Sequence, residues 1–174
     1  ATLCDGDCVT MVSPSKAFNL AGLQVANIVV KDARQRRLIN RAINDNETCD
    51  ISPFAIIALQ KAYDDGEQWL QAMLRYVRAN YDSVRDYVYQ NIPGMRVLPL
   101  EGTYLAWVDC REMLGWRGQA VAEFAEALRR DTGVWVQPGT AYGAEGEGFV
   151  RINLATTRAL LAEGMRRIRA YAQE

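Results

Sequence analysis

Two basic residues have neighbours that would allow them to take part in catalysis or ligand binding. The first is Lys16, in the segment "SPSKAFNLAGL". A lysine amine attacks a carbonyl group when desolvation or a nearby positive charge favours its uncharged form. The flanking residues are small or apolar and include no carboxylate, while Ser13 and Ser15 provide hydroxyl groups. A turn of this kind can also direct N–H groups at an anion such as phosphate. From these residues alone, a surface lysine remains the simpler interpretation of Lys16.

The second residue is Arg151, in the apolar stretch "GFVRINLA". A guanidinium group inside a buried strand costs free energy unless an anion pairs with it, and its planar fork fits both oxygens of a carboxylate. Asp109, Glu145 and Glu147 could supply that carboxylate from within the chain, or a bound ligand could supply it. The sequence leaves these two alternatives open.

Composition argues against several classes of protein. The chain has 174 residues, 49% of them hydrophobic, which is enough to bury a core. Its 20 basic and 21 acidic residues give a net charge of -1, which argues against nucleic acid or an acidic membrane as a partner. The apolar runs are shorter than the ~20 residues of a membrane-spanning helix, and no signal segment opens the chain. The sequence therefore predicts a soluble, cytoplasmic protein.

The reactive side chains narrow the chemistry further. There is no histidine, so this chain alone cannot build a Ser–His or Cys–His nucleophile, and no metal site is predicted. The cysteines, at positions 4, 8, 49 and 110, form no CxxC pair and are expected to be free thiols. The glycines of "PGTAYGAEGEG" precede a strand and match neither a dinucleotide fingerprint nor a Walker loop.

The hydrophobic pattern alternates between strands and helices, with a compositional break near residues 45 to 52. The first two strands, on either side of Lys16, and the helix that opens at Ser52 are expected to be buried. Tyr104 and Trp107 are expected to pack in the core, with a substrate contact as the lesser alternative. The expected elements are strands at 7–13 and 25–30, helices at 32–43, 52–63 and 67–90, strands at 95–100 and 103–110, a helix at 118–133, strands at 134–139 and 149–155, and a helix at 157–171.

Three segments together resemble one family. "SPSKAFNLAGL" matches S-x-S-K-[TA]-F-N-[LI]-A-G-L, the Schiff-base lysine motif of fold-type I pyridoxal-phosphate enzymes in the class I/II aminotransferase superfamily. It looks most like the cystathionine β-lyase, or C–S lyase, branch. "EGTYLAWVDCR" resembles a strand of that branch, and "PGTAYGAEGEGFVRINLATTRALLAEGMRRI" is similar to its C-terminal signature. The three segments occur in the family's order and cover most of the chain.

The resemblance implies an α/β protein with the pyridoxal-phosphate-dependent transferase (aspartate aminotransferase-like) fold. Residues 1–50 would form the end of the large cofactor-binding domain, 51–90 the connecting long helices, and 91–174 the small C-terminal α+β domain. Members of the family are longer, and several of their cofactor contacts lie upstream of the lysine. The chain is therefore expected to be the C-terminal half of such an enzyme, and to be inactive on its own.

The resemblance implies a role for individual residues of this chain. The resemblance makes Lys16 the residue that binds pyridoxal 5′-phosphate covalently and then moves the Cα proton of an amino-acid substrate. Ser13 would contact the phosphate, with Ser15 as a weaker candidate, and Arg151 would hold the substrate α-carboxylate. Gln24 stands where transaminases of this superfamily often carry a phosphate-binding arginine, which favours the lyase branch. The intact enzyme is expected to be a homodimer.

The activity implied by the resemblance is α,β-elimination on L-cystathionine or a related cysteine conjugate, which gives a thiol, pyruvate and ammonia. An aminotransferase on the same scaffold is the nearest alternative. Alternatives of other classes are the ligand-sensing domain of a transcription regulator and a non-catalytic remnant. A winged-helix segment upstream of the chain would favour the sensor.

Overall fold

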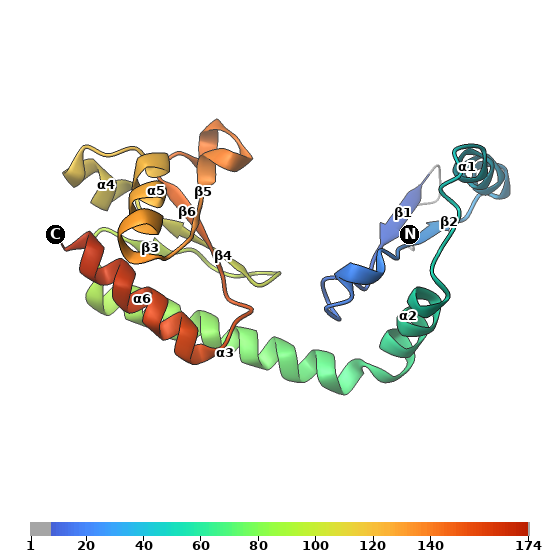
Figure 1. The fold of residues 1–174 in the computed structure, drawn as a ribbon, viewed down its shortest axis with the longest axis horizontal. Helices are drawn as coiled ribbons and strands as arrows, with labels where there is room; N and C mark the ends of the chain where they lie inside the picture. The colour runs from blue at the N-terminus through green and yellow to red at the C-terminus, as the bar shows by residue number, and fades with distance from the viewer. Residues whose placement is uncertain (1–7, 174) are drawn as a thin grey trace. The chain divides into compact units, whose positions relative to one another are not determined.

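The computed structural model describes residues 8–173. The chain divides into two compact units, with the boundary between Met73 and Leu74 (Figure 1). The boundary falls within the longest helix, α3 (Glu67–Asn91). Each unit has its own sheet. The division expected from the sequence, with boundaries near 50 and 90, stays a prediction.

The first unit is built around one antiparallel pair of strands. Asp32 caps the first long helix, because its side chain accepts a hydrogen bond of 2.7 Å from the backbone N–H of Gln35. The segment between the strands, residues 13–26, carries Lys16 and is called the lysine loop below. The elements are β1 (Val9–Val12), η1 (Ala21–Leu23), β2 (Asn27–Val30), α1 (Ala33–Asp45) and α2 (Pro53–Asp65).

The expectation that these strands and α2 are buried is wrong for this structure. Within the strands only Val30 is buried, while Met11 is 73% exposed, and α2 buries only Ala55 and leaves Phe54 76% exposed. Apolar runs predict burial because apolar surface leaves water when another element covers it. In residues 8–73, most of these apolar side chains stay in contact with solvent.

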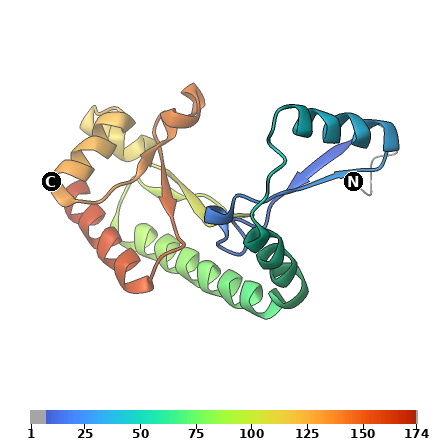
Figure 2. The same cartoon turned by 45° about the vertical axis from the view of Figure 1, so that its right-hand side comes forward.

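The second unit is an antiparallel sheet with the strand order β3-β4-β6-β5, together with helices (Figure 2). Strand β6 runs from η3 to the turn before α6. Helices α3 and α6 lie side by side, and the amide of Gln173 donates a 3.4 Å hydrogen bond to the carbonyl of Asn91. The elements that follow α3 are β3 (Arg96–Val97), β4 (Leu105–Asp109), α4 (Arg111–Arg117), α5 (Val121–Thr132), β5 (Gln137–Pro138), η2 (Gly139–Tyr142), η3 (Ala144–Gly146), β6 (Phe149–Asn153) and α6 (Arg158–Ala172).

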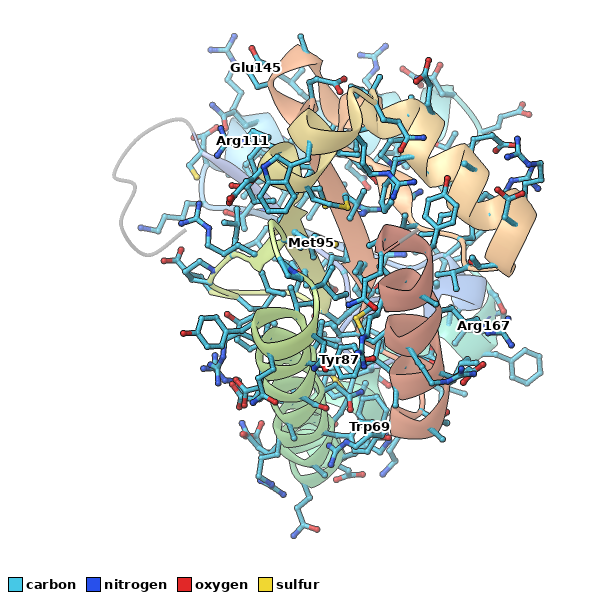
Figure 3. The ribbon with its side chains drawn as sticks, turned by 90° about the vertical axis from the view of Figure 1, so that its left-hand side faces the viewer. Trp69, Tyr87, Met95, Arg111, Glu145 and Arg167 are labelled. Atoms are coloured by element: carbon cyan, nitrogen blue, oxygen red, sulfur yellow. The ribbon has the colours of Figure 1, made fainter. Side chains whose placement is uncertain are left out.

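The two faces of this sheet differ in burial. Side chains alternate between faces along a strand, and on one face Ala106, Val108, Val150 and Ile152 are all buried. They form a core with the buried side chains of α3, α5 and α6, and Met95 belongs to the same core (Figure 3). The opposite face carries the residues between them in sequence and stays half-buried.

Two details differ from the expected elements. Helix α4 was not predicted from its sequence "REMLGWR", in which the apolar pattern covers barely two turns. Strands β3 and β5 have 2 residues each and are shorter than expected. Both lie at the edges of the sheet, and the prolines Pro99 and Pro138 cannot donate a hydrogen bond to a neighbouring strand.

The cysteines have different surroundings. Cys49 and Cys110 are free thiols, the first exposed and the second buried, whereas Cys4 lies outside the described residues. Burial raises the pKa of the Cys110 thiol to about 12, with the nearby Asp109 carboxylate acting in the same direction. Cys110 is therefore a core residue without thiolate chemistry at neutral pH.

A buried amide fixes the end of β6 against α3. Asn80 in α3 is fully buried, and its side-chain amide donates hydrogen bonds to the carbonyls of Leu154, at 2.9 Å, and Thr156, at 3.0 Å. Its Oδ1 accepts a 3.3 Å bond from the side chain of Arg158. Two carbonyls in an irregular turn are thereby satisfied without water.

We expect Asn80→Leu, which keeps the branched shape of the side chain but removes its donors, to lower the free energy of unfolding by about 2–3 kcal/mol, because it leaves these carbonyls buried without donors. Urea unfolding followed by circular dichroism measures the change. The matched control is Gln90→Leu at an exposed position of the same helix, which should stay within about 0.5 kcal/mol. Equal losses for both variants would contradict the role given to Asn80.

A carboxylate holds the opposite end of the sheet. Asp109, with a side chain that is 11% exposed, accepts hydrogen bonds from Arg111 Nη2 at 2.8 Å and from Arg96 Nη2 at 3.1 Å. These bonds lower the pKa of Asp109 to about 2. The hydrogen bond from the Arg111 side chain is the largest cause, and the Arg111 backbone N–H and Arg96 add to it, so that together they outweigh the opposing effect of partial burial.

A lowered carboxyl pKa stabilises the fold above the unfolded-state value, and this stability is lost as the pH falls through the folded-state value. We therefore expect Asp109→Asn to lower the free energy of unfolding by about 1–2 kcal/mol at pH 7. We expect no larger loss because both arginines are largely exposed, so that water screens their attraction to the carboxylate. The difference from the unaltered chain should shrink between about pH 4 and pH 2, as measured by urea unfolding across that range. Glu101→Gln, at an exposed carboxyl, is the control. A difference that did not change with pH would refute the assignment.

Candidate active site

The lysine loop has a defined backbone. The N–H of Phe18 donates to the carbonyl of Pro14, and the N–H of Leu20 donates to the carbonyl of Ser15, both at 2.9 Å. Lys16 lies between these bonds and its side chain is exposed. No ion pair or hydrogen bond holds its amine among residues 8–173. The amine is therefore accessible to a carbonyl compound, and no carboxylate of the described chain competes for it.

The two serines of the loop have different partners. Ser13 Oγ donates a 2.7 Å hydrogen bond to the carbonyl of Val25 and accepts a 3.2 Å bond from the N–H of Ser15. The only hydroxyl hydrogen of Ser13 is thus used to join the start of the loop to its end. The Ser15 hydroxyl has no partner within the described part of the chain. In this conformation the Ser15 hydroxyl can donate to an anion without breaking a bond within residues 8–173, and the order of Ser13 and Ser15 as phosphate contacts stays a prediction.

Aromatic packing anchors the loop. The Phe18 ring lies 6.0 Å from that of Tyr63, edge to face, and 6.1 Å from that of Trp69, stacked. A Cβ on Gly66 would come within 2.6 Å of the Phe18 ring and 2.3 Å of the Ala62 carbonyl oxygen. Only glycine allows this close approach. The residues next to Lys16 are therefore held by α2 and the start of α3.

Gln24, where a transaminase often has arginine, ends η1 in a left-handed conformation with φ of 51°. Its side chain is exposed. A positive φ is uncommon for a residue other than glycine, and it turns the chain toward β2. Its position fits a role in the shape of the loop.

Arg151 lies in a row of three residues across the second sheet. The register pairs Trp107 of β4 with Arg151, and Arg151 with Gln137 of β5. Directly opposed residues point to the same face, with Cβ atoms ~5 Å apart. All three therefore share the half-buried face, opposite the core.

Tyr142 of η2 completes this cluster, which we call the Arg151 site: Trp107, Gln137, Tyr142 and Arg151. The guanidinium carbon lies 4.4 Å from the centre of the Tyr142 ring, and the Trp107 and Tyr142 rings meet edge to face at 5.5 Å. Gln137 Oε1 accepts hydrogen bonds from Arg151 Nη2 and, at 2.6 Å, from the Tyr142 hydroxyl. Within residues 8–173, only neutral groups hold the guanidinium group in place.

None of the carboxylates considered from the sequence forms an ion pair with Arg151 in this structure. Asp109 binds Arg96 and Arg111, and Glu147 accepts a 2.9 Å bond from the N–H of Val121. Glu145 lies in η3 at the outer end of its loop (Figure 3). No carboxylate of residues 8–173 forms an ion pair with Arg151. Its charge is therefore available to an anionic ligand.

The structure changes the view of several aromatic and polar residues. Tyr104 and Trp107 are half-buried and lie outside the buried core, so the expectation of core packing is only partly met. Sequence reasoning missed Gln137 and Tyr142 as members of a site. The available signal was the strand alternation "VWVQ" and the tyrosine of "PGTAYG", but their contact with Arg151 depends on strand register.

Other kinds of site find no support in the described residues. Between residues 8 and 173, no group of three or more histidine, cysteine, aspartate or glutamate side chains is arranged to hold a metal ion. None of the helices described is both long enough and apolar enough to cross a membrane.

Comparison with known proteins gives a consistent result. The model of the family "Aminotransferase class I and II" matches residues 2–168. The cystathionine β-lyase PatB of Bacillus subtilis is 32% identical over 93% of this chain, and the match covers 41% of that protein. This chain thus spans about two fifths of the length of such relatives.

Solved structures agree in fold. The pyridoxal-phosphate-bound C–S lyase of Staphylococcus hominis has a TM-score of 0.85 at 31% identity, covering 98% of this chain and 43% of that one. Cystalysin of Treponema denticola, which contains a pyridoxal 5′-phosphate cofactor, has a TM-score of 0.83 at 25% identity, covering 95% and 41%. The fold expected from the sequence is confirmed. With the match over residues 2–168, these findings show that the chain belongs to the aminotransferase class I and II family.

Proposed function

We propose that the intact protein, meaning the longest natural polypeptide that contains this chain, is a pyridoxal-phosphate-dependent C–S lyase. Its substrate would be L-cystathionine or a related cysteine conjugate. The observation that carries the proposal is Lys16, an exposed amine with no counter-ion among the described residues, on a loop whose sequence matches the C–S lyase motif. The similarity to a cystathionine β-lyase and to C–S lyase structures supports it.

The residues of the lysine loop fit the cofactor. Lys16 would bind pyridoxal 5′-phosphate through its amine, and the Ser15 hydroxyl would donate to the phosphate. Ser13 would either hold the loop, as it does here, or exchange its Val25 bond for a phosphate oxygen. When bound, the cofactor supplies an electron sink for the carbanion formed at the substrate Cα.

The chain's own residues would bind the substrate and move its protons. Arg151 would hold the α-carboxylate, and Lys16 would remove the proton from Cα. The electron pair left at Cα forms the double bond to Cβ as the Cβ–S bond breaks, and the sulfur leaves as a thiolate that takes up a proton. Water then converts the remaining three-carbon fragment to pyruvate and ammonia. One water is consumed and no oxidant is needed.

Three further properties are part of the proposal. We expect the intact protein to be a homodimer and to be cytoplasmic. We expect this chain alone to show no lyase activity, since it spans about two fifths of the length of its relatives.

The test is the release of pyruvate and thiol from L-cystathionine by the intact protein, with no keto acid added. Lys16→Ala should lower the rate by at least about 10²–10⁴-fold, the usual contribution of a positioned acid/base group. The control is Lys61→Ala, at an exposed lysine that pairs with Asp65 on the surface of α2 at 2.8 Å. Unchanged pyruvate release by Lys16→Ala would refute the role of Lys16.

An aminotransferase is the second candidate, because the matching family includes that activity in its description. The same incubation separates the two. Amino transfer that requires a keto acid, without thiol release, would replace the lyase by the aminotransferase.

A further inference from the structure

Gln137 is the only residue within the described chain whose side chain bonds to Arg151, and Arg151 can only donate hydrogen bonds. The carboxamide oxygen must therefore face the guanidinium group, which also fixes the orientation of the amide. The Tyr142 hydroxyl donates to the same oxygen at 2.6 Å. Both lone pairs of Gln137 Oε1 are thus occupied.

The geometry restricts Arg151 in two further ways. One face of its guanidinium group stacks on the Tyr142 ring at 4.4 Å, and Gln137 holds Nη2 at one edge. No other described residue accepts from its remaining N–H groups. The free edge can therefore receive both oxygens of a carboxylate, in an orientation that is set before the ligand arrives.

For the binding of an anionic ligand, the absence of charge on Gln137 matters as much as its shape. A glutamate here would place a carboxylate on Arg151 and provide an internal counter-ion, because it has nearly the same shape as glutamine. An arginine already paired with a carboxylate binds a second one less well, because the incoming anion must compete for the same charge. The carboxamide orients the guanidinium group and leaves its charge uncompensated.

We propose that Gln137 is a positioning residue that makes the Arg151 site selective for carboxylate ligands, by orienting Arg151 without neutralising it. This inference rests on the proposed function, in which Arg151 holds the substrate α-carboxylate. Gln137 would then be a second residue, besides Arg151, that determines how much more tightly the site binds amino acids than the corresponding amines. It also predicts that the selectivity depends on the charge at position 137 more than on its size.

The test uses two probes that divide the functional groups of S-methylcysteine between them. β-(Methylthio)propionate keeps the carboxylate, and methylthioethylamine keeps the amine. Their dissociation constants for the intact protein are measured by calorimetry, so that no turnover is required. Gln137→Glu should weaken binding of the carboxylate probe about tenfold, the value of one hydrogen bond to a charged group, and leave the amine probe unchanged. Gln137→Met, which is neutral and of similar length, should weaken binding of the carboxylate probe by only about threefold.

Two further variants separate the possible outcomes. Gln90→Glu adds the same charge at an exposed position of α3 and should change neither constant. Arg151→Met tests the proposed function: if it leaves the carboxylate probe unaffected, or if that probe does not bind the unaltered protein, the assignment of Arg151 fails and this inference fails with it. If Arg151→Met weakens the probe and neither Gln137 variant does, only the inference on Gln137 fails. Equal losses for Gln137→Glu and Gln137→Met would also overturn it, because charge would then not be the cause.

Discussion

The antiparallel register of β4, β6 and β5 is the constraint on which the second unit depends. It pairs Trp107 with Arg151 and Arg151 with Gln137, so these residues share one face. The same register places Val108 and Val150 on the buried face. Because side chains alternate, a slip of one residue in β6 would move Arg151 into the core and an apolar side chain into the site. The apolar core and the polar site are therefore selected together.

Polar groups hold this arrangement at both ends of the sheet. Asn80 satisfies the carbonyls of Leu154 and Thr156 after β6, and Asp109 joins the end of β4 to two arginines. Each is a nearly buried group with its hydrogen bonds satisfied, which favours one backbone path over close alternatives. Arg151 differs from Asp109, because its partners among the described residues are neutral. A structural ion pair compensates its own charge, whereas the charge of Arg151 is left for a ligand.

In the first unit, unlike the second, elements with an apolar sequence pattern are mostly exposed. Strands β1 and β2 and helix α2 have apolar sequences, yet most of their side chains are exposed. The lysine loop is nevertheless well defined, because Phe18 packs on Tyr63 and Trp69 and Ser13 joins its two ends. Local contacts suffice to shape the loop that carries Lys16.

The sequence by itself determined the family, the positions of most helices and strands, and the two basic residues on which the proposed chemistry depends. These are local properties: a motif of consecutive residues around Lys16, a helix cap at Asp32, and an alternating strand around Arg151. The tertiary structure alone decided that Gln137 and Tyr142 contact Arg151, that no carboxylate of residues 8–173 forms an ion pair with it, and that α2 is exposed. Strand register and burial depend on which distant segments meet, and neither propensity nor periodicity within one segment contains that information.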